Sequence, residues 1–219
     1  MIESYLVRRA VCGRSTKAYN RVFPGLLKRL SEADVPTAAL LAAHLQGLSG
    51  GETQDWPDDP TFQKAWLELN TYKALRTAKT KMLLEALELG SRNDVHHESA
   101  QLPSAALHVE HVLPVAWEAH WLSPGDENAV LLRNHLLHNI GNLTLLTAKL
   151  NPSLSNSGFG VKRPEITKSL LALNAHFQGP AFAVQEPVWD ETRIRERART
   201  LFDVAARIWP FGAPKSAKP

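Results

Sequence analysis

The sequence predicts a mainly α-helical protein that carries one small β-β-α island between about residues 105 and 175. Apolar residues recur at helical spacing through the first hundred residues, which favours helices there. Residues 107–113 and 142–147 instead form short apolar runs of strand character. Helical spacing returns in residues 161–177 and 191–209, and these patterns together predict the fold class.

The front of the chain is predicted to begin with helices over residues 4–12 and 15–30. A kink is expected near Pro24, because proline removes one N–H from the helix ladder. A third helix is predicted over residues 36–48, since Pro36 suits a first turn.

Two further helices are predicted before the island. The first places Phe62, Trp66 and Leu69 on one side. The second covers about residues 71–89 and is expected to stop at Gly90, because glycine suits the position after a helix end. The polar residues that follow are predicted to form a linker.

The island is predicted to pair its two strands across a turn at residues 123–126 and a helix at 127–137. The predicted domain organisation, in chain order, is a helical front half (1–104), a β-β-α core (105–177), a C-terminal helix packing on it (178–210) and a tail (211–219).

Composition limits the class of protein. A chain of 219 residues that is 44% hydrophobic can bury a core, and its formal net charge of +3 permits a polyanionic partner without requiring one. Cys12 is the only cysteine, which excludes an intrachain disulfide and a cysteine zinc site. Arg8 and Arg9 interrupt any signal-peptide core, and no apolar run could span a bilayer. We therefore expect a soluble, cytoplasmic protein.

Basic clusters and tryptophans receive structural interpretations. The arginines and lysines of residues 8–29, 73–81 and 193–199 are interpreted as solvated helix faces, the last cluster as a salt-bridged surface. The tryptophans expected in the core or in packing between domains are Trp66, Trp121, Trp189 and Trp209.

The segment His108-Val-Glu-His-Val-Leu-Pro114 carries the most chemical information. Hydrolysis of a phosphodiester needs a proton acceptor, a cation near the phosphate and a group that holds the acceptor in the right tautomer. Histidine suits the first role, and a carboxylate or amide oxygen suits a hard cation such as Mg²⁺. Glu110 and His111 are adjacent, so on a regular strand they would point to opposite faces. Because Pro114 ends the strand, a local bend could bring both into one pocket.

Other interpretations of these residues stay open at this point. His108 could be a surface histidine, a third metal ligand or a substrate contact. Asn142, after a glycine, could serve a turn, as could Asn151 before proline. The histidines that could form a four-histidine zinc site are His108, His111, His135 and His138, but residues three apart on a strand face opposite ways. No His-Glu-x-x-His helix is present to suggest a metalloprotease.

Several motifs taken in order resemble the HNH, or ββα-metal, nucleases. They are the segment 108–114, His138-Asn-Ile-Gly-Asn142-Leu-Thr-Leu-Leu, then Asn151, Asn156 and Lys162. More narrowly, they are similar to the C-terminal nuclease domain of GmrSD-type (type IV) restriction enzymes and of SspE-type phosphorothioate-dependent DNA-defence proteins. The flanks around residues 5–9, 19–21 and 189–197 fit the same family, so the resemblance spans roughly residues 3–210. It implies that the island is a ββα-metal (HNH, His-Me finger) element embedded in a helical domain.

The resemblance also implies roles for the site residues. His111 matches the general base, and Glu110 matches the acidic metal ligand before it. Asn142 matches the middle asparagine, which braces the loop and orients the histidine. Asn151 matches the final metal ligand, and Asn156 is a rival for that position. One Mg²⁺ or Mn²⁺ ion is implied as the cofactor.

Three further residues receive broader roles from the same resemblance. Lys162 would contact phosphate or stabilise the leaving group, and His138 would contact phosphate or help shape the site. His108 is a possible additional site residue.

The function implied is a metal-dependent endonuclease that nicks or cuts DNA, the effector of a modification-sensing restriction or anti-phage defence system. Its partners would be DNA, held mostly by phosphate contacts, and a nucleotide-hydrolysing sensor domain on the same or a separate chain. No Gly-rich phosphate loop is present here, since residues 47–51 lack the Gly-Lys-Ser/Thr ending. We therefore expect an excised nuclease domain or one subunit of a split system. The alternative is a non-catalytic HNH-like module that binds DNA or a partner.

Overall fold

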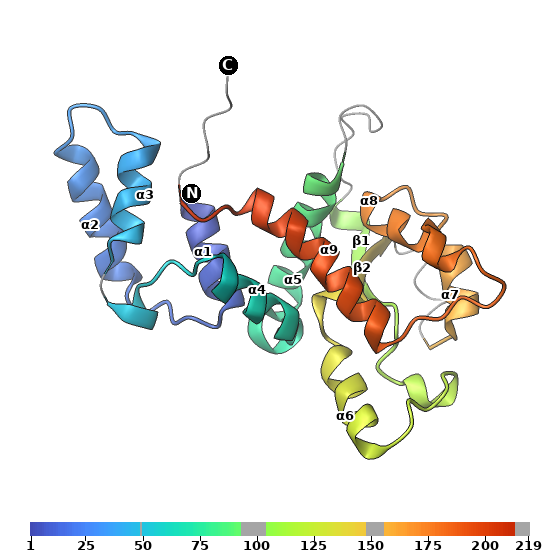
Figure 1. The fold of residues 1–219 in the computed structure, drawn as a ribbon. Helices are drawn as coiled ribbons and strands as arrows, with labels where there is room; N and C mark the ends of the chain where they lie inside the picture. Colours follow the sequence, from blue (N-terminus) through green and yellow to red (C-terminus); the bar gives the residue numbers. More distant parts are fainter. Residues whose placement is uncertain (49, 93–103, 148–155, 213–219) are drawn as a thin grey trace. The chain divides into compact units, whose positions relative to one another are not determined.

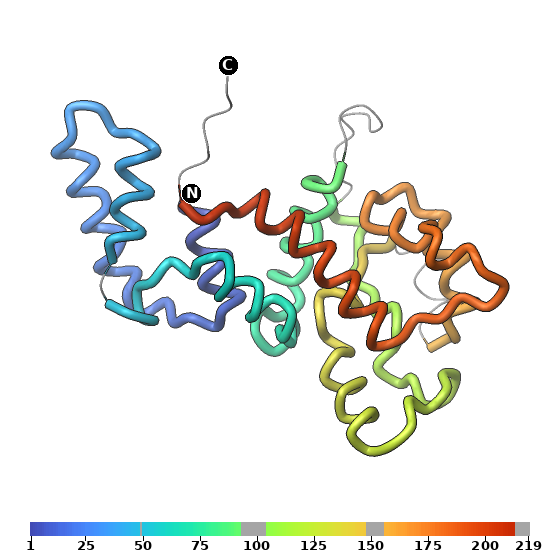
Figure 2. Tube along the Cα trace, in the orientation of Figure 1, coloured from blue at the N-terminus to red at the C-terminus, as the bar shows by residue number. Residues whose placement is uncertain are grey.

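A computed structural model describes residues 1–48, 50–92, 104–147 and 156–212 of the chain. These residues are mainly helical and contain one two-stranded sheet, so the mainly α fold class is confirmed (Figure 1). Contacts divide the chain into unit 1, which comprises Met1–Trp66 and the stretch from Ala205, and unit 2, which comprises Leu67–Val204. Figure 2 follows both along the Cα trace. None of the described helices is both long and apolar enough to cross a membrane.

Unit 1 is helical, as predicted. Its elements are α1 (Ile2–Val11), α2 (Tyr19–Ser31), α3 (Ala38–Gln46), the 3-10 turn η1 (Gly51–Thr53) and most of α4 (Asp59–Glu68). Tyr5, Val22, Leu45 and Trp56 form its core. Pro24 lies inside α2, with helix on both sides of it.

Arg8 and Arg9 are not on a solvated face, so the interpretation of their cluster is wrong at these two positions. Both side chains are fully buried in unit 1. Arg8 pairs with Asp59 and donates to the carbonyl oxygens of Pro57 and Trp209. A buried guanidinium needs such partners because its desolvation is costly. These arginines therefore join segments far apart in the sequence.

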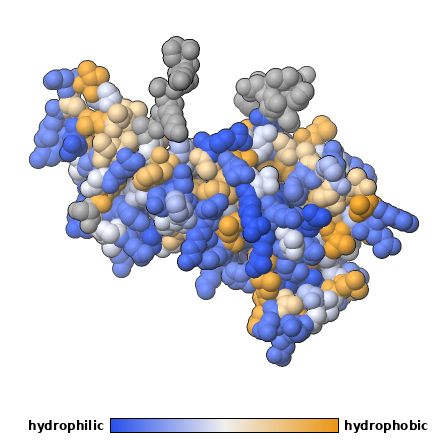
Figure 3. All heavy atoms as spheres, in the orientation of Figure 1, coloured by the Kyte–Doolittle hydropathy of each residue, from blue (hydrophilic) through white to orange (hydrophobic). Residues whose placement is uncertain are grey.

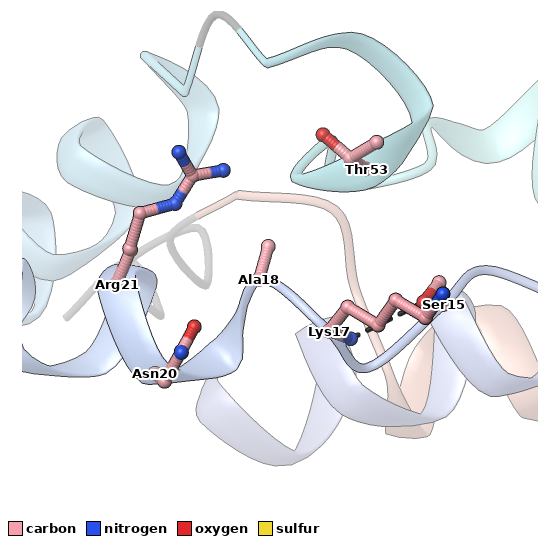
Figure 4. Close-up of a pocket in the computed structure, with 6 residues that line it drawn as sticks. All are labelled: Ser15, Lys17, Ala18, Asn20, Arg21 and Thr53. Carbon is pink, nitrogen blue, oxygen red and sulfur yellow. Dashed lines mark hydrogen bonds between the residues drawn. The ribbon is translucent and has the colours of Figure 1, made fainter.

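A hollow of about 520 Å³ opens on unit 1. Its walls come from the segment before α2, the first turn of α2 and η1 (Figure 4). Lys17 and Arg21 give it a basic lining, together with the polar side chains of Ser15, Asn20 and Thr53. None of the predicted site residues lines it.

Unit 2 contains the sheet and the remaining elements. In chain order these are α5 (Thr71–Ser91), η2 (Ser104–Ala106), β1 (Leu107–His111), η3 (Trp117–Ala119), α6 (Glu127–Leu136), η4 (Ile140–Asn142), β2 (Leu143–Thr147), α7 (Phe159–Ile166), α8 (Ala172–Ala175), η5 (His176–Gln178), η6 (Pro180–Phe182) and α9 (Glu191–Ile208). The strands pair antiparallel, from Leu107 opposite Thr147 to His111 opposite Leu143. Apolar side chains around Phe159, Phe177 and Trp189 form the core.

The first strand ends earlier than predicted, at His111 instead of at residue 113. The N–H groups of Val112 and Leu113 are taken by the backbone and side-chain oxygens of Asn142, at 2.9 and 2.8 Å. Both residues still face the core. One asparagine therefore replaces the next step of the strand ladder.

The single helix predicted over residues 161–177 is wrong, because α7 and α8 are separate helices. Leu171 is extended between them, and α8 begins at Ala172. The carboxylate of Glu88 in α5 accepts hydrogen bonds from the N–H groups of Ala172 and Leu173, at 3.1 and 2.9 Å. Unpaired amides at a helix start favour an acceptor, so the break is stabilised by a distant residue.

The C-terminal helix α9 packs very closely on η4. A Cβ added to Gly141 would lie 2.1 Å from the carbonyl oxygen of Ile194, so only glycine fits this approach. Arg197 is buried and donates to the carbonyl oxygens of Gly141 and Leu143, at 2.8 and 2.7 Å. Burial lowers the pKa of Arg197 to about 9.

The interpretation of the 193–199 cluster as surface is therefore wrong for Arg197. It holds for the exposed Arg195 and Arg199, and hydrophilic atoms cover the region of α9 in the space-filling view (Figure 3).

Helix α5 contains a break that the sequence does not indicate. Arg76 has φ 60° and ψ 169°, whereas the helix continues on both sides and runs past Gly90 to Ser91. This part of backbone space is strained for any residue with a Cβ. The start of α5 is therefore set at an angle to its longer C-terminal part.

Replacing Arg76 with glycine is expected to raise the free energy of unfolding by about 1 kcal/mol, because glycine adopts this conformation without strain. The matched control is Ala78→Gly, at an exposed helical position, where glycine should lower the free energy of unfolding by about 1 kcal/mol. Urea unfolding measures both. Equal losses of stability in the two variants would contradict the strain at Arg76.

Candidate active site

Five of the predicted site residues, Glu110, His111, His138, Asn142 and Lys162, lie around the end of β1. Glu110 and His111 are the last residues of β1, and Asn142 ends η4 just before β2. His138 lies between α6 and η4, and Lys162 lies in α7. Residues from separate parts of the sequence are thus brought together by the sheet and its connections.

Glu110 and Lys162 form a buried ion pair. Lys162 Nζ lies 2.7 Å from Glu110 Oε1 and donates to the backbone oxygen of His111, also at 2.7 Å. The Lys162 side chain is fully buried and that of Glu110 is 11% exposed. Burial lowers the pKa of Lys162, and the carboxylate of Glu110 opposes that shift. The predicted contact of Lys162 with phosphate would have to use the one N–H that these two bonds leave, on a side chain that is fully buried.

His111 is held by a second histidine. Its Nε2 lies 3.0 Å from His138 Nδ1, and the two rings meet edge to face. Burial lowers the pKa of His111 to about 4, with further lowering from His138 and Lys162. Burial also lowers the pKa of His138. Both imidazoles are therefore neutral at pH 7, and a neutral imidazole can accept a proton.

Tyr72 completes this group, although the sequence gives no signal for it. Its ring stacks on His111 at 5.3 Å between centroids and 21° between planes, and it contacts His138 at 5.2 Å. Burial and the nearby charge of Glu110 raise the pKa of Tyr72. Tyr72 therefore contacts both histidines and lies within the electrostatic influence of Glu110.

Asn142 is fully buried at the end of η4, in the connection between α6 and β2. Its Nδ2 donates to the carbonyl oxygens of Leu113 and Leu137, both at 2.8 Å. Its Oδ1 accepts from the Leu113 N–H at 2.8 Å and from Trp189 Nε1 at 3.0 Å. These bonds go to Leu113, Leu137 and Trp189 and not to the His111 ring, so the side chain fixes the backbone next to the histidines.

The other predicted residues lie apart from this group. His108 is exposed on β1 opposite Leu146, and His135 is exposed on α6. Asn156 is exposed in a turn before α7. Asn151, the predicted final metal ligand, lies outside the described residues. The four-histidine site is therefore not assembled, since only His111 and His138 meet.

The end of β1 carries a proton acceptor and a carboxylate on adjacent residues, His111 and Glu110. Lys162 donates a hydrogen bond to Oε1 of Glu110, whereas no hydrogen bond to Oε2 is seen among the described residues. A carboxylate oxygen of this kind is a ligand that Mg²⁺ prefers. Among the described residues, no group of three or more His, Cys, Asp or Glu is placed to hold a metal ion. A divalent ion would thus depend on Glu110 and on ligands beyond that group, for which Asn151 is the predicted residue.

A sequence model of the family described as GmrSD restriction endonucleases, C-terminal domain, matches residues 56–204, which is more than half of the chain. The match contains every residue of the group around His111. No curated protein and no solved structure matches the chain.

Asn142→Ala is expected to lower the free energy of unfolding by about 2–5 kcal/mol, because it leaves several buried backbone groups without a partner. The matched control is Asn134→Ala. Asn134 is exposed on α6 and accepts one hydrogen bond from Trp117 Nε1, so its loss should lower the free energy of unfolding by about 1 kcal/mol. Urea unfolding at pH 7 measures both variants. A small effect of Asn142→Ala would show that the connection does not depend on this amide.

Lys162→Met is expected to lower the free energy of unfolding by about 3–5 kcal/mol, because it leaves Glu110 as a buried unpaired charge. Adding Glu110→Gln to the same chain should recover most of the loss. Lys168→Met breaks the exposed Lys168–Glu165 pair and should cost less than about 1 kcal/mol. Denaturant unfolding measures all three variants. If Lys162→Met with Glu110→Gln is as unstable as Lys162→Met alone, the ion pair does not account for the loss.

Proposed function

The chain belongs to the family of GmrSD restriction endonuclease C-terminal domains, and from that premise we propose that unit 2 is a metal-dependent DNA endonuclease whose proton acceptor is His111. One observation carries the proposal. The last two residues of β1 carry a buried carboxylate paired with an ammonium and a neutral imidazole hydrogen-bonded at Nε2.

The proposed reaction hydrolyses one phosphodiester bond. His111 takes a proton from a water molecule as its oxygen attacks phosphorus. The bond from phosphorus to the 3′ oxygen breaks, and that oxygen is protonated from solvent, which leaves a 5′ phosphate. When bound by Glu110 and Asn151, one Mg²⁺ or Mn²⁺ ion supplies positive charge to the phosphate and the leaving oxygen.

We infer that β1, β2 and α7 are the ββα-metal element of an HNH nuclease. The support is positional, since the strands pair directly and α7 supplies Lys162 to Glu110 at the end of β1. In this arrangement Lys162 has a role different from a phosphate contact. It holds Oε1 of Glu110, and so orients the carboxylate.

The wider setting is part of the same proposal. The family name indicates a restriction endonuclease, for which DNA is the substrate. We propose that contacts are made mainly to phosphates, which position the duplex without specifying its sequence. Recognition of a modification, such as glucosylated hydroxymethylcytosine or a phosphorothioate, would belong to a nucleotide-hydrolysing sensor domain. The effector would act in the cytoplasm against phage DNA.

A second candidate function is a non-catalytic HNH-like module. It is favoured by the lack of a three-ligand cluster of His, Cys, Asp or Glu in the described part of the chain. Such a module would bind DNA or a partner without cutting it.

Supercoiled plasmid incubated with Mg²⁺ or Mn²⁺ is expected to be nicked, and His111→Ala should slow nicking by about 10²–10⁴-fold, because the proton acceptor is lost. DNA binding should be unchanged in a gel-shift assay. His135→Ala removes an exposed histidine and is the matched control, expected to nick at the wild-type rate.

Three outcomes contradict parts of the proposal. Wild-type nicking by His111→Ala rules out His111 as the base. Cutting that persists in EDTA rules out a required divalent ion. DNA binding without any nicking by the wild-type chain supports the non-catalytic module.

A further inference from the structure

The His111 ring is constrained from two directions, by Tyr72 and by His138. Tyr72 covers one face of the ring, and His138 holds its Nε2 edge. Tyr72 lies in the first turn of α5, far ahead of the motif in the sequence. The group is therefore formed by tertiary structure and not by the motif alone.

Tyr72 and His138 approach His111 as one structural piece. The N–H of Thr71 donates to the carbonyl oxygen of His138 at 2.9 Å, next to Tyr72 in the chain. Asn139 Nδ2 donates to the carbonyl oxygen of Leu67, also at 2.9 Å. The end of α4 and the start of α5 are thus both hydrogen-bonded to the His138–Asn139 segment.

The hydrogen bond between the histidines permits two proton arrangements. A bond between two ring nitrogens needs one donor and one acceptor. If His111 Nε2 carries the proton, its Nδ1 keeps a free lone pair. If His138 Nδ1 carries it, His111 is protonated at Nδ1 and has no nitrogen left to accept a proton. Only the first arrangement makes His111 a base.

The first arrangement is also the chemically favoured one. It places the proton on Nε2 of both rings, which is the more stable tautomer of a neutral histidine side chain. His138 is only partly buried, so its own Nε2–H has access to water. The stacked Tyr72 ring restricts rotation of His111 about its side-chain bonds, because a rotated ring would lose the stack.

We propose that Tyr72 and His138 are positioning residues that hold His111 in the tautomer with Nε2 protonated and Nδ1 free. The inference rests on the proposed function, in which His111 takes a proton from water. It assigns the role of Tyr72 to its ring and not to its hydroxyl group.

The direct test is nitrogen-15 NMR of the imidazole rings at neutral pH, with His111 assigned by its absence in His111→Gln. We expect an Nε2-protonated pattern for His111 in the wild-type chain and in Tyr72→Phe. Tyr72→Leu should give a pattern averaged between the two tautomers. His138→Ala should do the same, whereas His138→Asn should restore the wild-type pattern because its amide oxygen replaces the Nδ1 acceptor. An Nδ1-protonated His111 in the wild-type chain overturns the proposal.

Nicking kinetics give the second readout. Tyr72→Leu and His138→Ala are expected to lower kcat by about 10- to 100-fold with little change in KM, because they displace the base without touching DNA. Tyr72→Phe and His138→Asn should stay within about threefold of wild type, since they preserve the ring and the acceptor. Lys79→Ala, exposed on the same helix, is the control.

The two proposals fail in different ways. If the wild-type chain does not nick but His111 has the expected tautomer, the nuclease function fails and the positioning holds. If Tyr72→Leu folds, retains the wild-type tautomer and nicks at the wild-type rate, the role of Tyr72 is overturned while the nuclease function stands. Should Tyr72→Leu not fold, the His138→Ala and His138→Asn pair decides in the same way.

Discussion

The side-chain amide of Asn142 is the interaction on which the candidate site depends. It is fully buried, and its oxygen and nitrogen are bonded to the segments on either side of it. One of those segments begins directly after His111, and the other ends directly before His138. The 3.0 Å separation of the two rings is therefore set by a residue that touches neither of them. An unpaired amide in such a place would be costly, so the connection has one well-satisfied arrangement.

The opposite side of this connection is closed by α9. Gly141 lets the carbonyl of Ile194 come closer than any side chain would permit, and Arg197 binds the carbonyl oxygens of Gly141 and Leu143. The guanidinium is buried against the carbonyls that it binds, and its lowered pKa reflects that burial. The C-terminal helix thus acts on the site through the backbone of η4.

Sequence reasoning located most elements but missed what depends on distant contacts. The sequence predicts both strands to within two residues at each end, because short apolar runs are local signals. The break before α8 was missed because Glu88 stabilises it from another helix. Arg197 was placed on the surface, although its neighbours Ile194 and Leu201 mark the apolar side of α9. Tyr72 carried no signal, since stacking on His111 follows from the docking of α5.

The low pKa of His111 has two opposed consequences for the proposed reaction. It keeps the imidazole unprotonated at neutral pH, yet a base of pKa about 4 has a weak affinity for a proton. The bond to His138 does not remove this weakness, because His138 itself contributes to the lowered pKa of His111. What the bond supplies is position. With Nε2 donating to His138, only Nδ1 is left to accept a proton, so the pair fixes where the acceptor lies and not how basic it is.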